Sequence, residues 1–306
     1  MPGIVVVGSI HTDLVITTER LPTPGETRIG GEFHTFPGGK GANQAVAAAR
    51  LGGEVWMVGR VGADLYGRFQ RESLGAAGVH TDFVTTDADA ASGVALIMVE
   101  RGGNNTIVVA PGASGRCAPE DVDRAAAVIA GADALLLQLE IPLETVEYAA
   151  RLAAQHGVRV ILDPAPAQPL PPALLEMVHL VTPNETEAAL LCGFDPGERH
   201  EPAELAARIQ QRVRGPVLIT LGAQGVLAMV DGQTLQVPAV PVEAVDATAA
   251  GDTFSGALAV ALTEGRNLAD AIRWANHAAA LAVTRLGAQS AVPTRREVDD
   301  FAGSSC

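Results

Sequence analysis

Short apolar runs alternate along this chain with longer alanine-rich stretches whose apolar residues recur at helical spacing. The first run, residues 3–10, is rich in valine and isoleucine and lacks polar alternation, as expected for a strand buried on both faces. A helical stretch follows at residues 41–52, and the same strand-then-helix order recurs over residues 132–230. This alternation predicts an α/β fold with a mainly parallel central sheet.

Two stretches interrupt the alternation. Residues 14–36 contain strand-like segments but no helix, and residues 92–110 have the pattern of two strands joined by a Gly-Gly-Asn-Asn turn at 102–105. Together they predict a small separate β-sheet over one end of the core, which would act as a lid. We therefore expect one domain over residues 1–306 with these two stretches as its lid, and a frayed tail at 302–306.

Composition and cysteine usage narrow the class of partner. The 306 residues include 21 Lys plus Arg and 35 Asp plus Glu, so the net charge of −14 argues against nucleic acid or an anionic membrane. The N-terminal apolar run is too short for a signal or membrane segment. Cys117, Cys192 and Cys306 are widely separated and lack CxxC spacing, which predicts a cytoplasmic protein with reduced thiols and no zinc site.

The common nucleotide and hydrolase motifs are absent from the sequence. In the "PGGKGAN" segment, Gly41 replaces the Ser or Thr of a Walker A loop and His34 replaces its upstream glycine. The "GSIHTD" segment after the first strand lacks the GxGxxG pattern of a dinucleotide-binding dehydrogenase, and neither GxSxG nor HExxH occurs. If this protein transfers phosphate, it must therefore bind the phosphates with an architecture other than these common motifs.

The segment "VDATAAGDTFSGALAVAL" places small residues and an aspartate where an apolar helix begins. The backbone amides of Ala249, Ala250 and Gly251 have little side-chain cover, and amides at a helix N-terminus favour an anion. Asp252 has two interpretations: it caps the helix, or it is a base beside an anion-binding turn.

Taken in order, the motifs of the chain resemble the ribokinase-like carbohydrate kinase family over nearly the full length. The motifs are "GSIHTD", "FPGGKGANQAVAAARLG", "LLLQLEIPLE", "LDPAPA", "TPNETE", "LITLGAQG", "VDATAAGDTFSGAL" and "AVTRLGAQ". The resemblance implies a three-layer α/β/α core with a β-sheet lid. It also implies that Asp252 is the catalytic base and that the amides of Ala249, Ala250 and Gly251 form an anion hole.

The resemblance further implies a set of ligand-binding residues. Sugar recognition would involve His11, Asp13, Gly39, Lys40, Asn43 and Glu140, together with Asp252. ATP binding would involve Asn184, Thr220, Gly222, Gly225, Gly251 and Asn276, with Glu187 arranging the water shell of Mg²⁺. Taken singly, several of these residues have structural interpretations: a turn for Asp13, a solvated charge for Lys40, and helix capping for the Asn184–Glu187 pair.

A monovalent cation site is also implied. Its contributors would be Asp246 and Thr248 together with carbonyl groups of Ala282, Arg285 and Gly287. Ala291 stands where the family more often has serine, so one hydroxyl ligand is missing and K⁺ activation would be weaker. Asp246 could instead simply brace the loop before the helix.

The activity that the resemblance implies is ATP-dependent phosphorylation of D-ribose at its 5-hydroxyl, in a homodimer joined through the lids. His11 stands where the family has asparagine, so a related kinase for fructose, deoxyribose or a nucleoside is kept as an alternative. A non-catalytic sugar sensor on the same fold is a third hypothesis, although the intact Asp252 and anion hole argue against it.

Overall fold

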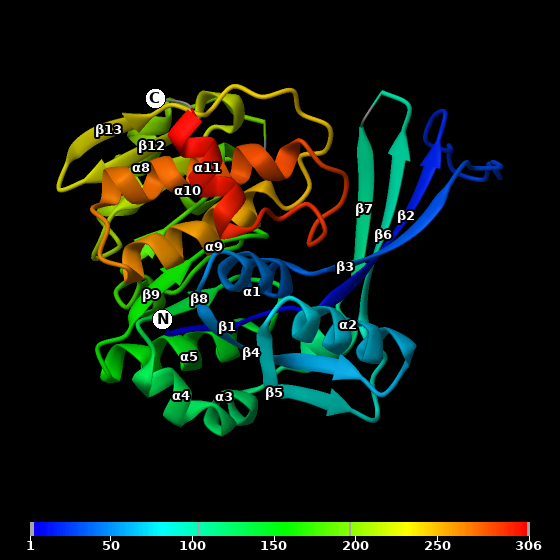
Figure 1. Ribbon diagram of the computed structural model, residues 1–306, viewed down its shortest axis with the longest axis horizontal. Coiled ribbons are helices and arrows are strands. Elements are labelled where there is room, and N and C mark those ends of the chain that lie inside the picture. The colour runs from blue at the N-terminus through cyan, green and yellow to red at the C-terminus, as the bar shows by residue number, and fades with distance from the viewer. Residues whose placement is uncertain (1–2, 103, 196, 305–306) are drawn as a thin grey trace.

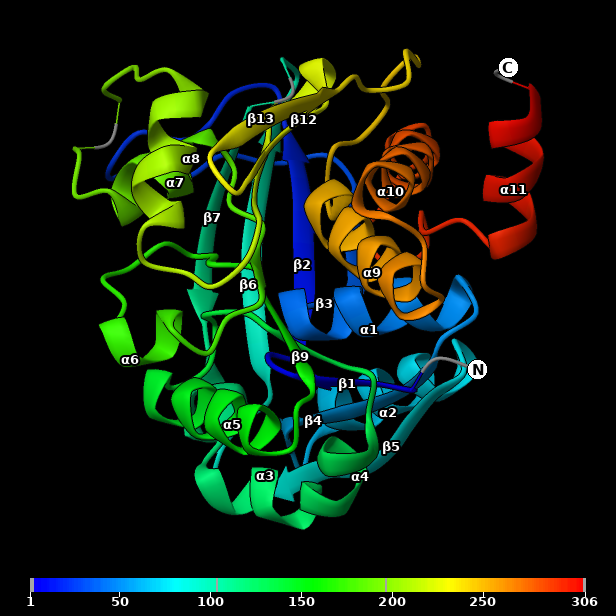
Figure 2. The ribbon, with the colours of Figure 1, turned by 90° about the vertical axis from the view of Figure 1, so that its left-hand side faces the viewer.

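A nine-stranded sheet crosses the computed structural model and carries helices on both faces (Figures 1 and 2). The structure describes residues 3–102, 104–195 and 197–304. Pairing is parallel except at the β11–β12 and β12–β13 edges, so the predicted mainly parallel α/β fold is confirmed. The strands, in spatial order, are β13 (Gln233–Val237), β12 (Val226–Val230), β11 (Val217–Thr220), β10 (Leu180–Val181), β9 (Arg159–Leu162), β8 (Ala134–Leu137), β1 (Gly3–Val7), β4 (Glu54–Gly62) and β5 (Val79–Asp87).

The helices form one layer on each face of this sheet (Figure 2). The first layer contains α1 (Lys40–Arg50), α2 (Leu65–Ala76), α9 (Ala250–Thr263), α10 (Leu268–Val283) and α11 (Arg295–Ser304). The second contains α3 (Pro119–Arg124), α4 (Ala126–Gly131), α5 (Leu143–Gln155), α6 (Pro172–Leu175), α7 (Glu185–Leu191) and α8 (Pro202–Gln210). Two 3₁₀ turns, Gly112–Arg116 and Gly222–Gln224, complete the described helical elements. Strand β1 is buried on both sides of the sheet, and its residues are therefore apolar. Ile4 and Val6 pack against the first helix layer, whereas Val5 and Val7 pack against the second.

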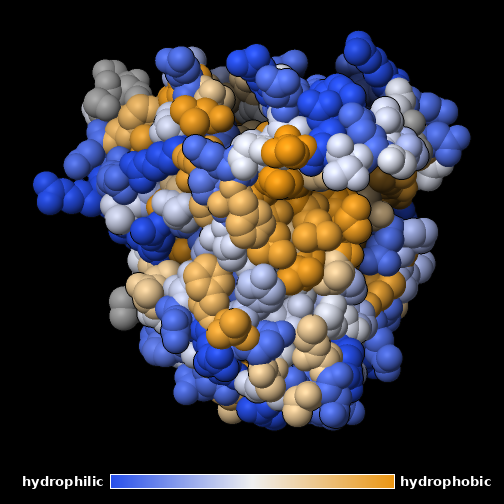
Figure 3. Space-filling view, turned by 90° about the vertical axis from the view of Figure 1, so that its right-hand side faces the viewer, coloured by the Kyte–Doolittle hydropathy of each residue, from blue (hydrophilic) through white to orange (hydrophobic). Residues whose placement is uncertain are grey.

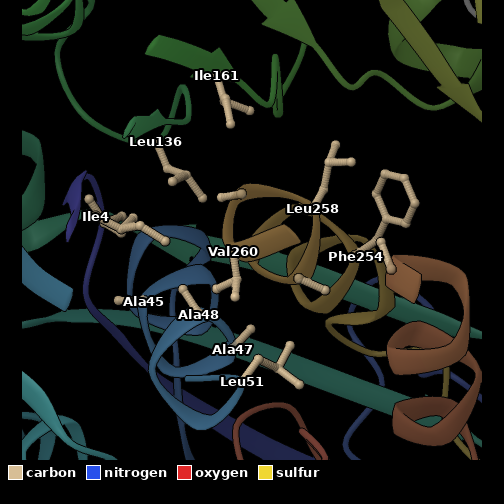
Figure 4. Packing of buried hydrophobic residues seen from close by; sticks show 14 of the residues in the cluster. Ile4, Ala45, Ala47, Ala48, Leu51, Leu136, Ile161, Phe254, Leu258 and Val260 are labelled. Carbon is tan, nitrogen blue, oxygen red and sulfur yellow. The ribbon is translucent and has the colours of Figure 1, made fainter. Parts of the chain in front are cut away.

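Helix α9 lies against α1 through small side chains (Figure 4). Ala47 and Ala48 of α1 pack in the same cluster as Leu258 and Val260 of α9. A Cβ at Gly256 would stand 2.6 Å from the Cβ of Ala47, so glycine is required for this close approach. The contact fixes the first turn of α9, which carries Asp252, beside the start of α1.

A separate four-stranded sheet stands beside the core, at the right of Figure 1. Its order is β3 (Phe33–Gly38), β2 (His11–Thr18), β6 (Gly93–Glu100) and β7 (Asn105–Ala110). The β2–β6 pair is parallel and the other two pairs are antiparallel. Strands therefore occur in both of the stretches predicted to form the lid. Strand β2 begins at His11, which is before the predicted stretch 14–36 begins. Gly103 of the predicted turn lies outside the described residues.

The C-terminal segment departs from the prediction of a frayed tail. Helix α11 continues to Ser304, because Phe301 packs edge-on against His277 of α10 with ring centroids 5.7 Å apart. Residues 305–306, which include Cys306, lie outside the described part of the chain.

Strand β5 was not predicted. Among the described residues, no helix is both long and apolar enough to cross a membrane.

Candidate active site

The first turn of α9 carries Asp252 as a buried side chain. Ala249 occupies the N-cap position with a left-handed backbone (φ 58°), so the capping interpretation of Asp252 is wrong. The Asp252 carboxylate instead accepts hydrogen bonds from Asn43 Nδ2 at 2.9 Å and from Gln44 Nε2 at 3.2 Å. Two neighbouring side chains of α1 therefore hold both oxygens of this carboxylate.

A polar cavity of about 220 Å³ opens at this helix end. It brings together the predicted base, the predicted anion hole, Lys40 and three of the residues predicted to bind ATP or Mg²⁺. The amide of Ala250 also donates to the carbonyl of Ala247 at 3.2 Å. The lining residues are Lys40, Asp163, Thr182, Asn184, Glu187, Thr220, Ala247, Ala249, Ala250, Gly251, Asp252 and Ser255.

Burial and charge act in opposite directions in this cavity. Burial raises the pKa of Asp252 above its ordinary value, while Lys40 and the bonds from Asn43 and Gln44 lower it. Burial raises the pKa of Asp163 to about 8, against the opposing charge of Lys40. Burial lowers the pKa of Lys40, but the surrounding acidic side chains, led by Asp252 and Asp163, raise it. Their combined effect is larger, so the net shift of the Lys40 pKa is upward. Lys40 is therefore the cation that compensates the buried acids.

Glu140 contacts two of the other predicted sugar-binding residues, Lys40 and His11. Its Oε2 accepts from the backbone amide of Lys40 at 3.0 Å and from Ser9 Oγ at 2.5 Å, and it lies 3.8 Å from His11 Nδ1. Asp13 is buried nearby, and desolvation with the charges of Glu140 and Asp252 raises its pKa to about 7. Unpaired carboxylate oxygens in this arrangement suit the hydroxyl groups of a polyol.

Gly39 is needed where the small sheet meets α1. Its φ is 88°, and a Cβ there would stand 2.6 Å from the backbone nitrogen of His11. The close approach places the start of α1, with Lys40 and Asn43, beside the start of β2 with His11 and Asp13. The predicted sugar-binding residues thus meet at the junction of the two sheets.

His11 borders a second cavity of about 440 Å³, which Glu140 also lines. Its ring is 2% exposed, and its Nε2 has no hydrogen-bond partner in the described part of the chain. Burial lowers the pKa of His11, and the negative charge of Glu140 only partly offsets this effect. His11 is therefore neutral near neutral pH, with one ring nitrogen still able to bond a ligand.

The residues predicted to bind nucleotide are only partly gathered at the first cavity. Asn184 and Glu187 form a capping box at the start of α7, with reciprocal bonds of 2.9 and 2.8 Å, as the capping interpretation expects. Both also line the cavity, beside Thr220. Gly222 and Gly225 flank the adjacent 3₁₀ turn. Asn276 donates instead to the carbonyls of Val237 and Pro238, so its role toward adenine stays a prediction.

Three of the residues predicted to hold a monovalent cation are linked by hydrogen bonds. The Asp246 carboxylate accepts from Thr248 N at 2.9 Å, from Thr248 Oγ1 at 2.6 Å and from Gly287 N at 2.9 Å. The carbonyl of Ala282 accepts from the amide of Arg285 at 3.1 Å. Asp246 therefore braces this loop. Among the described residues, no cluster of three or more His, Cys, Asp or Glu side chains could hold a metal ion.

Four residues that line the first cavity were not predicted from the sequence, namely Asp163, Thr182, Ala247 and Ser255, and neither was Gln44, which hydrogen-bonds to two of the lining acids. Asp163 directly follows β9, and its Oδ2 accepts from Gln44 Nε2 at 2.8 Å. Gln44 lies within the helical motif that supplied Lys40 and Asn43, where it resembled an ordinary polar helix residue. The position of Asp163 was a usable signal, because the carboxyl ends of parallel strands meet at one edge of a sheet and form ligand sites there.

The chain belongs to the pfkB family of carbohydrate kinases, whose family model matches residues 1–295. Its relatives include the ribokinase of Haemophilus influenzae, 42% identical over 296 residues (97% of each chain). The ribokinase of Bacillus subtilis is 43% identical over 301 residues, covering 98% of this chain and 99% of the relative. The predicted resemblance is therefore confirmed.

Solved structures agree with this assignment. The ribokinase of Thermotoga maritima has a TM-score of 0.91 at 37% identity and matches 99% of this chain and 100% of its own. The ribokinase of Arabidopsis thaliana, solved with ribose and ATP, has a TM-score of 0.88 at 34% identity, with 98% of each chain covered. The predicted ribokinase-like fold is thus confirmed as well.

Proposed function

We propose that this protein uses ATP to phosphorylate D-ribose at its 5-hydroxyl, giving D-ribose 5-phosphate and ADP. The observation that carries the proposal is the buried Asp252 carboxylate, placed in one cavity with Lys40 and the amide-rich start of α9. The sequence relatives named ribokinase support ribose as the sugar.

In this proposal Asp252 accepts the proton of the 5-hydroxyl as that oxygen attacks the γ-phosphorus of ATP. Lys40 and the amides of Ala249 and Gly251 stabilise the negative charge of the transferring phosphoryl group. Asp13, Asn43 and Glu140 hold the remaining hydroxyls so that the 5-hydroxyl points to Asp252. The Asn43 Oδ1 atom is buried and unpartnered in the described structure, which suits a sugar hydroxyl donor.

The first cavity also fits a nucleotide with Mg²⁺. Glu187 supplies a carboxylate to the same cavity as the start of α9, and a magnesium ion that keeps its waters needs few protein ligands. When bound, Mg²⁺ would neutralise charge on the phosphates. Asn184 and Thr220 would bind the nucleotide beside it, with Gly222, Gly225 and Asn276 further along.

We also propose K⁺ as an activating cation at the loop braced by Asp246. The hydrogen bonds that join Asp246, Thr248 and Gly287 support a preformed turn. This turn immediately precedes the amides of Ala249 to Gly251, so a fixed positive charge there would stabilise the anion-binding conformation.

A homodimer through the small sheet is proposed from its exposed face. Leu96 and Val108 pair across β6 and β7 and are 53% and 60% exposed, while Phe33 pairs with Ile16 on the same face and is 61% exposed. Figure 3 shows a broad apolar area on this side of the molecule. Apolar clusters of this kind mark interaction surfaces, and a second copy of the sheet would cover it.

The sheet would then act as a lid that excludes water from the phosphoryl group. A cytoplasmic location is also proposed, and the free thiols of Cys117 and Cys192 support it.

A coupled ADP-release assay with Mg²⁺ and K⁺ tests the proposal across D-ribose, deoxyribose, fructose and adenosine. We expect the highest kcat/KM for D-ribose. If another compound of the panel gave a higher kcat/KM, that compound and not ribose would be the preferred substrate. If no compound of the panel supported ADP release, a non-catalytic sugar sensor would be favoured.

A further inference from the structure

One buried amide group links two acidic side chains at the site. Gln44, on α1, is 1% exposed, and its Nε2 donates to Asp163 Oδ2 at 2.8 Å and to Asp252 Oδ1 at 3.2 Å. Asp163 and Asp252 come from different elements, one directly after β9 and the other from the first turn of α9. Gln44 is the side chain of the described structure that hydrogen-bonds to both carboxylates.

The other end of the Gln44 amide is also hydrogen-bonded. Gln138, which follows β8 and is fully buried, donates from its Nε2 to Gln44 Oε1 at 2.6 Å. If the Gln44 amide were reversed, its oxygen would face two carboxylates and lose the bond from Gln138. The three hydrogen bonds therefore select the orientation in which the NH₂ group faces the acids.

Several charged groups surround Asp252, so the effect of Gln44 must be separated from theirs. Lys40 at the start of α1 favours the ionised form of Asp252, whereas Glu140 after β8 and Asp13 on β2 are like charges that oppose it. Asp163 after β9, whose pKa is raised to about 8, adds a like charge only when it is ionised above that pH. Direct hydrogen bonds to the Asp252 carboxylate come from Asn43 and Gln44. Asn43 would also bind sugar, which leaves Gln44 as the donor dedicated to the acids.

We propose that Gln44 is a positioning residue that holds the carboxylate of Asp252 in its ionised form, using Asp163 and Gln138 as anchors. The proposal rests on the proposed function, in which Asp252 is the base. A neutral donor suits this position because a second cation would pair with Asp252 and lower its basicity, whereas an amide carries no charge and does not titrate.

The test is the pH profile of kcat for Gln44→Met with D-ribose and ATP. Methionine has similar length and no N–H group, so Asp252 loses one hydrogen bond to its charged form. We expect the acid limb of the profile to move upward by about 1–2 on the pH scale. At a pH well above that limb kcat should approach that of the unmodified protein, and the KM for D-ribose should change little.

Two control variants separate positioning from a general loss of stability. Gln210, on α8, has a half-buried amide that donates to the carbonyl of Met229 and accepts from the backbone amide of Gly232. Gln210→Met removes this amide far from the acids and should leave the acid limb in place. Gln138→Met releases the far end of the Gln44 amide and should move the limb in the same direction by a smaller amount. If Gln44→Met does not fold, the Gln138→Met profile decides the question.

The proposal would be overturned if the acid limbs of folded Gln44→Met and Gln138→Met coincided with that of the unmodified protein. It would also be overturned if Gln44→Met lowered kcat by the same factor at every pH. Asp252→Asn separates this failure from that of the proposed function. Near-normal kcat in Asp252→Asn would refute the base itself, whereas an inactive Asp252→Asn with an unmoved Gln44→Met limb would refute only the role of Gln44.

Discussion

At the scale of residues, His11 is the predicted sugar-binding residue at which the sequence resemblance implied a departure from the family. The ring is buried, its Nε2 is unpartnered among the described residues, and its Nδ1 lies 3.8 Å from Glu140. A protonated His11 ring would therefore pair with the Glu140 carboxylate. Because burial lowers the pKa of His11, protonation occurs below the ordinary range of histidine.

The KM for D-ribose should therefore rise in two steps as pH falls. Asp13, whose pKa is raised to about 7, is protonated first and loses acceptor capacity for hydroxyls. His11 is protonated at lower pH, below about 6.5, and its ring nitrogen then no longer accepts. His11→Asn should keep the first step and remove the second. Coinciding KM profiles of the two proteins down to acidic pH would show that His11 is passive.

At the scale of elements, the site depends on how closely α9 lies against α1. A Cβ at Gly256 meets Ala47 Cβ at 2.6 Å and two backbone atoms of α1 at 2.9 Å. Gly256→Ala should therefore separate the helices, reduce the free energy of unfolding by about 1–3 kcal/mol and lower kcat, because Asp252 moves with α9. Gly75→Ala on α2, whose Cβ would meet open space, is the matched control and should be neutral or stabilising.

Urea unfolding and steady-state kinetics on both variants measure these effects. Equal stability and equal kcat for Gly256→Ala and the unmodified protein would show that the helix contact is looser than described.

The loop before α9 carries the prediction for potassium. K⁺ should give a higher kcat than Na⁺ at matched ionic strength, because a fixed cation beside Asp246 stabilises the anion-binding turn. Ala291→Ser supplies the hydroxyl ligand whose absence the sequence resemblance implied, so it should increase the ratio of the two rates. Identical rates in K⁺ and Na⁺ for both proteins would argue that Asp246 only braces the loop.

The sequence pattern predicted most of the central strands and helices but not the contacts between them. The unbroken apolar run of β1 and the alanine-rich helices predicted a parallel sheet, because burial on two faces leaves that pattern. The Asp252 environment could not be predicted in the same way, since Asn43, Gln44 and Asp163 meet it only after β9, α1 and α9 pack together. Strand β5 was missed because its exposed edge position permits polar residues such as His80 and Asp82.

At the scale of the whole molecule, the exposed face of the small sheet predicts a dimer. Light scattering at micromolar concentration should give twice the mass of the chain, and the double change Leu96→Asp with Val108→Asp should give a monomer, because charge opposes burial of this face. A monomeric unmodified protein would leave the apolar face without this explanation.

The central claim, that Asp252 acts as the base in phosphoryl transfer from ATP to D-ribose, is tested most directly by comparing ADP release in the unmodified protein and Asp252→Asn. Asparagine keeps the shape of the side chain and removes its basicity. We expect sugar-dependent ADP release whose kcat falls by about 10²–10⁴-fold in the variant, while ribose affinity measured by calorimetry changes far less. A folded Asp252→Asn protein with near-normal kcat would contradict the account.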